Sequence, residues 1–272
     1  MGLEMNDVTL RETPLRFDSG LADEEQTRKA DTLNLLPYAE ALRDFIHECE
    51  PPMTIGIQGD WGIGRTSLMN MLRGSGNLQD SGLLDSGQCQ AISLDSWPYS
   101  QFNQDDHMVV ASLYAITDEL GRALQSASGV DAEQLQLHLA ATQRKLMDVM
   151  QQIRELSQGK TLDTQEGKSY IDISGQMLRF KGEFEKLVAL WAHSEADRRV
   201  VIFVDDLDRI PPAMALELLE AIKNFMDVPG AIFVMALDYD VVQRGMVEKL
   251  GIDLQKTSGK AFFDKMIQLP FV

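Results

Sequence analysis

A glycine-rich turn between an apolar run and an amphipathic segment is the feature that most constrains the fold of this chain. Residues 53–57 read MTIGI, residues 59–66 read GDWGIGRT, and the next residues, SLMNMLR, place apolar side chains at helical spacing. The apolar run suits a buried strand, and the glycines let the backbone curl so that successive N–H groups point inward. The order of strand, glycine turn and helix therefore predicts an anion-binding loop at a helix N-terminus.

The second constraint is an apolar run that ends in two acidic residues. Residues 200–206 read VVIFVDD, so a buried strand delivers Asp205 and Asp206 to its carboxyl end, where parallel sheets bind ligands. Taken alone, this run also fits a strand that meets a polar turn. Combined with the glycine turn, it predicts that Asp205 holds Mg²⁺ and that Asp206 orients or deprotonates an attacking water molecule.

The predicted nucleotide site takes most of its residues from the glycine turn. These residues are Gly59, Asp60, Trp61, Gly62, Ile63, Gly64, Arg65, Thr66 and Ser67. Thr66 carries a hydroxyl at the position where such loops hold Mg²⁺, so it is the predicted metal ligand beside Asp205. A plain glycine turn without a ligand is the alternative interpretation.

Strand and helix patterns alternate along most of the chain. Beside MTIGI, the strand candidates are QAISLD, RRVVIFVDD, GAIFVMALD and KMIQLPF. The alternation predicts an α/β fold with a mostly parallel sheet that helices cover on both faces. Residues 106–197 contain helical patterns alone and are interpreted as an insertion between strands, within which residues 159–174 are expected to form a polar loop. Residues 1–30 are expected to be an acidic N-terminal segment and residues 31–272 a single domain.

The composition limits the possible partners. A formal net charge of −17 repels nucleic-acid backbones and anionic membranes, so we expect no nucleic-acid partner. Cys49 and Cys89 are the only cysteines, which fits a reducing cytoplasm. No apolar stretch reaches the roughly 18 residues that a membrane-spanning helix needs. These features predict a cytoplasmic location.

Several blocks of the sequence resemble the KAP family of P-loop NTPases. They are GDWGIGRTSL, LDSWPY followed by FNQDDH, VVIFVDDLDRIPP, LLEAIKNFMDVPGAIFVMALDYDVV and KMIQLPF. The resemblance runs from about Asp31 to the end of the chain. It implies the additional-strand type of ATPase fold, in which another strand lies between the phosphate-loop strand and the carboxylate strand. Because members of this family continue beyond the last block, it also implies a module without its C-terminal region.

The resemblance implies roles for three further residues. Asp208 and Arg209 match an Asp-Arg pair of the family, and Arg209 is the candidate that stabilises phosphate charge. An ion pair that holds the turn after the strand is the alternative role of Arg209. Asp238, at the end of the next strand, occupies the position of a polar group that senses the γ-phosphate. Its alternative role is to cap the following turn.

Arg65 departs from the family pattern, which has lysine there. Arginine keeps the charge but is longer and planar. It could neutralise phosphate in an adjusted loop, leave binding weak and hydrolysis nearly absent, or be an engineered change. Because Thr66, both aspartates and the three loop glycines are present, we expect ATP binding with reduced or conditional hydrolysis.

The resemblance also implies a function for the whole module. We expect an ATP- and Mg²⁺-dependent switch, associated with signalling or with exclusion of phage or plasmids. Self-association, or a partner protein bound through the helical insertion, is expected because related ATPases donate an arginine between subunits. A scaffold with a vestigial nucleotide site is the second hypothesis. A nucleic-acid motor is the third, and the acidic charge disfavours it.

Overall fold

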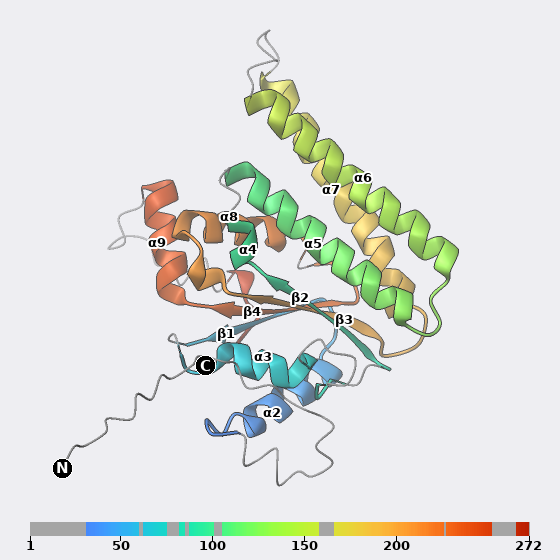
Figure 1. Ribbon diagram of the computed structural model, residues 1–272, viewed down its shortest axis with the longest axis vertical. Helices are drawn as coiled ribbons and strands as arrows, with labels where there is room; N and C mark the ends of the chain where they lie inside the picture. The colour runs from blue at the N-terminus through green and yellow to red at the C-terminus, as the bar shows by residue number, and fades with distance from the viewer. Residues whose placement is uncertain are drawn as a thin grey trace, which may run out of the picture.

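A five-stranded parallel sheet organises the chain in a computed structural model (Figure 1). The structure describes residues 31–59, 62–74, 82–84, 87–100, 105–157, 166–225, 227–251 and 265–271. The strands are β1 (Met53–Gln58), β2 (Cys89–Asp95), β3 (Arg199–Asp205), β4 (Ala231–Leu237) and β5 (Leu269–Phe271). All five lie where the apolar runs of the sequence predicted strands.

The strand order is β2-β3-β4-β1-β5. β4 pairs with β1 on one side and with β3 on the other, so it separates the strand before the glycine turn from the strand that ends in Asp205. The predicted additional-strand arrangement is therefore confirmed. Since the pairing is parallel, the carboxyl ends of these strands meet at one edge of the sheet.

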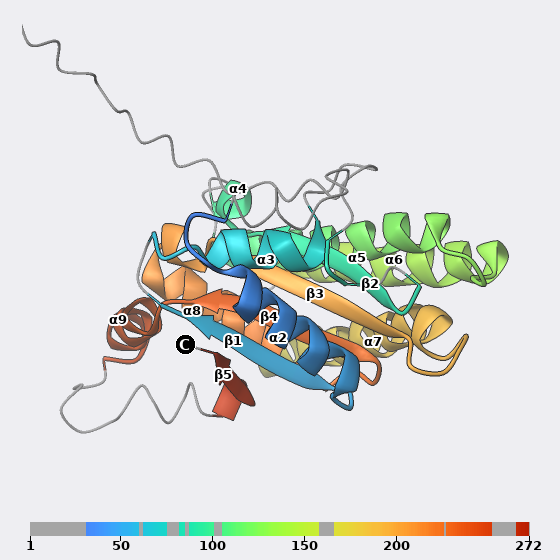
Figure 2. The same cartoon turned by 90° about the horizontal axis from the view of Figure 1, so that it is seen from below.

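Helices cover both faces of the sheet. α2 (Leu36–Glu48) and α3 (Arg65–Arg73) lie on the face toward the viewer in Figure 2, and α5 (Asp105–Ser126) and α8 (Pro212–Lys223) lie on the other. β3 shows why both layers are needed, because Val201 and Phe203 join the core under α2 and α3 while alternate residues of the strand join the opposite core. Strands that are buried on both faces read as continuous apolar runs.

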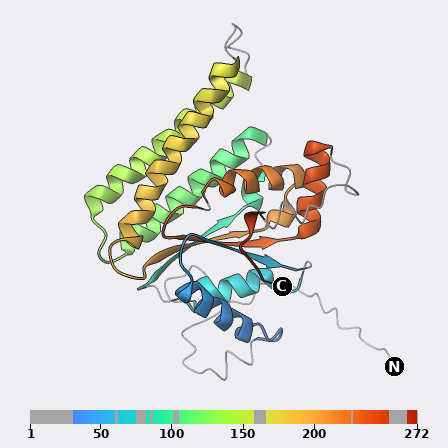
Figure 3. The ribbon, with the colours of Figure 1, turned by 180° about the vertical axis from the view of Figure 1, so that it is seen from behind.

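A long helical hairpin extends beyond the sheet. α6 (Ala132–Ser157) packs against α7 (Glu166–Ala192), and both reach past the other helices in Figures 1 and 3. Leu135, Leu139 and Leu146 of α6 are buried. The remaining elements are α4 (Trp97–Ser100), η1 (Leu207–Arg209) and α9 (Tyr239–Leu250). None of the helices that the structure describes is both long enough and apolar enough to cross a membrane.

One expected loop is partly helix. Residues 159–174 were predicted to be a polar loop, but α7 begins at Glu166. Polarity was a poor guide because lysine, glutamate and glutamine are good helix formers, and a helix can extend past its apolar stripe. Residues 1–30 lie outside the described residues. The division of the chain into an N-terminal segment, a domain at 31–272 and an insertion at 106–197 stays a prediction.

Candidate functional site

The glycine turn bends sharply before α3. Gly62 and Gly64 have φ values of 88° and 100°, in the left-handed region where residues with a side chain are strained. Gly59 differs, because its close neighbour is the movable end of a side chain. A methyl group added at Gly59 would lie 1.8 Å from the Cδ1 atom of Ile63, whose side chain folds over it. The sequence thus uses glycine where the backbone must turn and where a side chain passes close to it.

A short segment before α2 packs on the same turn. A methyl group added at Gly64 would lie 2.7 Å from Leu35 Cδ1 and 2.9 Å from Leu33 Cδ1. The Asp31 carboxylate holds this segment by accepting hydrogen bonds from the backbone N–H groups of Leu35 and Leu36, at 2.9 and 2.8 Å. Sequence reasoning missed this contact. The only available signal was the Asp-x-x-x-Leu spacing in front of the helix.

The remaining predicted residues of the turn differ in how well they can be placed. Asp60 and Trp61 lie outside the described residues. Thr66 is half-buried in the first turn of α3, and Ser67 beside it is buried and has a polar partner. Both side chains are therefore at the N-terminal end of α3, where helix N–H groups favour an anion.

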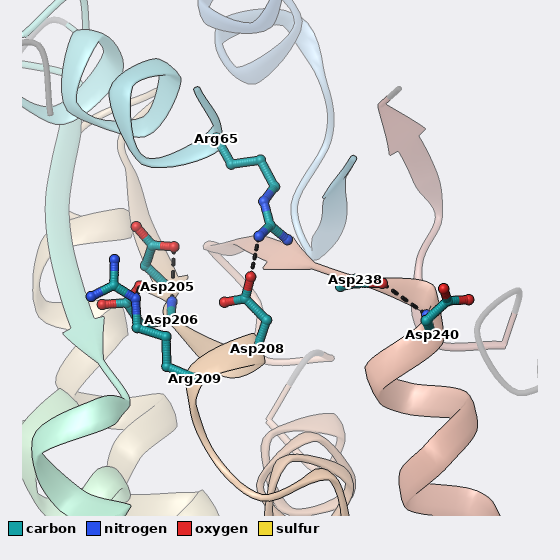
Figure 4. Close-up of polar contacts among 7 residues, drawn as sticks. All are labelled: Arg65, Asp205, Asp206, Asp208, Arg209, Asp238 and Asp240. Carbon is teal, nitrogen blue, oxygen red and sulfur yellow. Dashed lines mark hydrogen bonds and ion pairs between the residues drawn. The ribbon is translucent and has the colours of Figure 1, made fainter. Parts of the chain in front are cut away.

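The carboxyl end of β3 carries the predicted aspartates (Figure 4). Asp206 has a φ of 58°, and its backbone N–H donates a hydrogen bond of 2.8 Å to Asp205 Oδ1. Arg209 Nε lies 2.7 Å from Asp206 Oδ1 in an ion pair. Arg209 thus makes the turn-holding contact that was the alternative to a role on phosphate. The catalytic assignments of Asp206 and Arg209 stay predictions.

Burial raises the pKa of the Asp206 carboxyl to about 6, with the Asp205 charge as the second cause. Arg209 opposes this rise, and Asp95 adds to it. Asp95 ends β2 directly opposite Asp205 in the strand register, so a third carboxylate lies at this edge. Sequence reasoning missed Asp95, although an apolar run ending in aspartate signals it in the same way as for β3.

An ion pair joins the glycine turn to the end of β3. Arg65 Nη2 donates to Asp208 Oδ2 of η1 (Figure 4). The side chains are 7% and 14% exposed, so the pair is nearly buried. Arg65 Nη1 is also buried and has no hydrogen-bond partner among the described residues. The residue at the lysine position of the loop is thus held by the acidic residue that follows the two aspartates.

Asp238 lies at the end of β4, on the side of Asp208 away from Asp205 in Figure 4. It is the N-cap of α9, and its Oδ1 accepts a hydrogen bond of 2.8 Å from the backbone N–H of Asp240. This contact matches the capping role that was the alternative to sensing γ-phosphate. The sensing role stays a prediction.

The donor set fits Mg²⁺ better than a metal held by protein alone. Within the described ranges, no group of three or more His, Cys, Asp or Glu side chains is arranged to hold a metal ion. Mg²⁺ is usually bound by one or two protein oxygens together with phosphates and water. Thr66 and Asp205 offer such oxygens, and the unpartnered Arg65 Nη1 provides a buried cationic donor for a phosphate.

The fold and the loop define a class of protein. A parallel sheet with an added strand between a glycine loop and a strand ending in aspartates is the architecture of additional-strand P-loop NTPases. The chain belongs to the family described as "KAP family P-loop domain", whose model matches residues 36–272. A P-loop domain of this family implies nucleotide binding.

A curated relative comes from Escherichia coli (strain K12) and is named "Phage T7 exclusion protein". It is 20% identical over 247 residues, and the alignment covers 82% of this chain and 30% of the relative. This chain therefore spans less than a third of that protein.

Proposed function

We propose that this chain binds ATP with Mg²⁺ between the glycine turn and the end of β3, and acts as a nucleotide-dependent switch. The observation that carries the proposal is the ion pair of Arg65 with Asp208. It places a buried cation of the glycine turn directly beside the acidic end of β3. Phosphate recognition and metal binding then take place within one continuous site.

The residues divide the work of binding between them. The backbone N–H groups around Gly62, Gly64 and the first turn of α3 bind phosphate oxygens. Thr66 and Asp205 hold Mg²⁺, which supplies charge neutralisation on the phosphates when it is bound. Asp206 orients the attacking water molecule.

Hydrolysis is slow or conditional in this proposal. Asp206 is engaged by Arg209, so its carboxylate is not free to orient a water molecule until that contact changes. Arginine also fits the crevice of a phosphate loop less well than lysine does. ATP therefore remains bound long enough to alter contacts of the protein, as a switch requires.

The biological role follows from the relative. We propose that this module belongs to a protein that takes part in excluding phage, as the name of the relative says of that protein. The shared part covers 30% of the relative, so the remaining activities of such a protein would come from other regions.

Calorimetric titration with Mg·ATP tests the proposal. We expect saturable binding by the parental protein and tighter binding by Arg65→Lys. Asp205→Asn should lose the Mg²⁺ dependence, whereas the matched Asp118→Asn, at an exposed ion pair on α5, should bind as the parent does. No heat from either the parent or Arg65→Lys would overturn the proposal.

Self-association through the α6–α7 hairpin is the partner interaction that we propose. Leu137, Met147 and Leu178 are exposed on the two helices and supply apolar surface for it. Light scattering should report a larger assembly with a non-hydrolysable ATP analogue than without it. A monomer under both conditions contradicts this part of the proposal.

A scaffold with a vestigial nucleotide site is the second candidate. It is favoured by the Ile63 side chain that lies over Gly59. Phosphate release over long incubation separates the candidates, with Asp206→Asn as the background control. Release above this control supports a slow ATPase, and release equal to it, together with absent binding, supports the scaffold.

A further inference from the structure

The guanidinium of Arg65 is held at one end and unpartnered at the other. Nη2 donates to Asp208, whereas Nη1 is buried without a hydrogen-bond partner in the described part of the chain. Arginine carries five N–H donors in a rigid planar fork, so the contact at Nη2 fixes the direction of Nη1. A buried charged nitrogen without an acceptor is costly, which points to an acceptor that arrives with a ligand.

The position of Arg65 also calls for anionic partners. Arg65 is the first residue of α3, after the N-cap Gly64, where the helix dipole disfavours a positive charge. Asp208 offsets this charge from η1, a separate element that follows β3. Asp208 is 14% exposed, so water screens the pair only weakly.

The direction of the side chain separates Arg65 from an ordinary loop lysine. Asp208 draws the guanidinium toward the end of β3, where Asp205 and Asp206 also lie (Figure 4). In P-loop proteins, the terminal phosphate is the one that meets the metal and the attacking water. A guanidinium held at the end of β3 thus lies where a terminal phosphate would meet the predicted metal and water positions, and Nη1 is its unpartnered nitrogen.

We infer that Asp208 is a positioning residue that holds Arg65 so that its Nη1 binds the γ-phosphate. The ion pair then persists when a nucleoside triphosphate binds, and Asp208 makes the site select ATP over ADP. This inference rests on the proposed nucleotide binding and deepens it. It also links the ligand to η1, because Arg65 contacts the γ-phosphate and Asp208 at the same time.

The link continues from η1 into α8. Leu207 and Ile210, on either side of Asp208 and Arg209, are buried in the core, so η1 cannot move without its neighbours. α8 begins at Pro212 directly after it. A change in the position of Asp208 would therefore disturb α8, which lies on the sheet face opposite α3.

The test compares affinities for Mg·ATP and Mg·ADP by calorimetry in four proteins: the parent, Asp208→Asn, Arg65→Lys, and the double variant. Asp208→Asn should lower the ATP-over-ADP preference about tenfold, because Arg65 loses its charged anchor and the charge-assisted bond to the γ-phosphate. In the Arg65→Lys background the same substitution should change the preference less than about threefold, since a lysine reaches phosphate without Asp208.

The matched control is Asp227→Asn. Asp227 lies just before β4, at the sheet edge opposite the site, and forms an ion pair with Lys181 of α7. It should leave the preference unchanged. If Asp208→Asn does not fold, Asp208→Glu replaces it, and we expect a preference between that of the parent and one-tenth of it.

Each other outcome overturns the inference. Tighter ATP binding in Asp208→Asn would mean that Asp208 competes with phosphate. Equal losses for ATP and ADP, or a parental preference in Asp208→Glu, would mean a purely structural role. Absence of Mg·ATP binding by both the parent and Arg65→Lys would instead overturn the proposed function, and the two failures are thus distinguishable.

Discussion

The carboxyl edge of the sheet and the long helices α5, α6 and α7 differ in how deeply their charged residues are buried. At the edge, Arg65 and Asp208 form a nearly buried ion pair. On α5, Arg122 and Asp118 pair at the surface, with side chains 64% and 38% exposed. The α6–α7 hairpin is held together mainly by buried apolar residues, with one polar contact of 3.3 Å between His138 Nδ1 and Glu183 Oε2.

This difference indicates that the helices contribute to the stability of the fold more directly than the charged edge does. Apolar burial stabilises a fold directly, whereas a buried ion pair must first overcome the desolvation of both charges. A pair of hydrophobic residues at positions 65 and 208 would serve the fold as well or better. This is the physical reason for our proposal that the charges at the edge serve a ligand.

The largest expected effect is that of Asp208→Ala. It leaves Arg65 buried without its counter-charge, so the free energy of unfolding should fall by about 3–5 kcal/mol. Chemical denaturation measures this value. The matched control, Asp118→Ala at the exposed pair, should cost less than about 1 kcal/mol, and equal losses would break the comparison.

In the hairpin, Leu146→Ala should lower the free energy of unfolding by about 3 kcal/mol, because Leu146 is fully buried in the core. Nucleotide affinity should stay at the parental value. Leu137→Ala, at an exposed position of the same helix, should change stability by less than about 0.5 kcal/mol. Loss of nucleotide binding in folded Leu146→Ala would show that the two regions are not independent.

Glycine-to-alanine substitutions in the two regions should change the free energy of unfolding in opposite directions. Gly64→Ala should cost about 1–2 kcal/mol, since φ is 100° and the new methyl group would meet Leu35. Gly182→Ala in α7 should instead stabilise by about 0.5–1 kcal/mol, because nothing lies within 4 Å of the added methyl group. Thermal denaturation shows whether each variant is more or less stable than the parent. Stabilisation by Gly64→Ala would contradict the role that we assign to the left-handed backbone conformation of Gly64.

The smallest expected change in stability belongs to the double variant Arg65→Met, Asp208→Leu. Replacement of the whole ion pair by apolar side chains should leave the free energy of unfolding within about 1 kcal/mol of the parent. Mg·ATP binding should nevertheless be lost or strongly weakened. A folded double variant with parental ATP affinity would show that the pair does not serve the nucleotide.

Much of the fold was predictable from local patterns. Apolar runs marked the five strands, and the glycine turn marked the start of α3. The blocks shared with the KAP family predicted that β4 lies between β1 and β3, which spacing alone cannot reveal. The start of α7 at Glu166 was not predictable, because a polar helix and a polar loop have similar composition.

The sequence named candidate site residues but not the contacts between them. The sequence pointed to Arg65 and to the acidic end of β3, yet nothing in it indicated that Arg65 pairs with Asp208. The packing of Leu35 on Gly64 was missed for the same reason. Contacts between residues far apart in the chain depend on how the strands are ordered and how the helices pack.

The sequence by itself determined the class of fold and the family, and it named the residues that we propose to meet a phosphate or a magnesium ion. Periodicity, glycine placement and short motifs are properties of neighbouring residues, so they can be recognised before the chain folds. Only the tertiary structure decided which charge faces which. Electrostatic partners are chosen by distance and burial in three dimensions, and a parallel sheet brings Arg65 and Asp208 together across 143 positions of sequence.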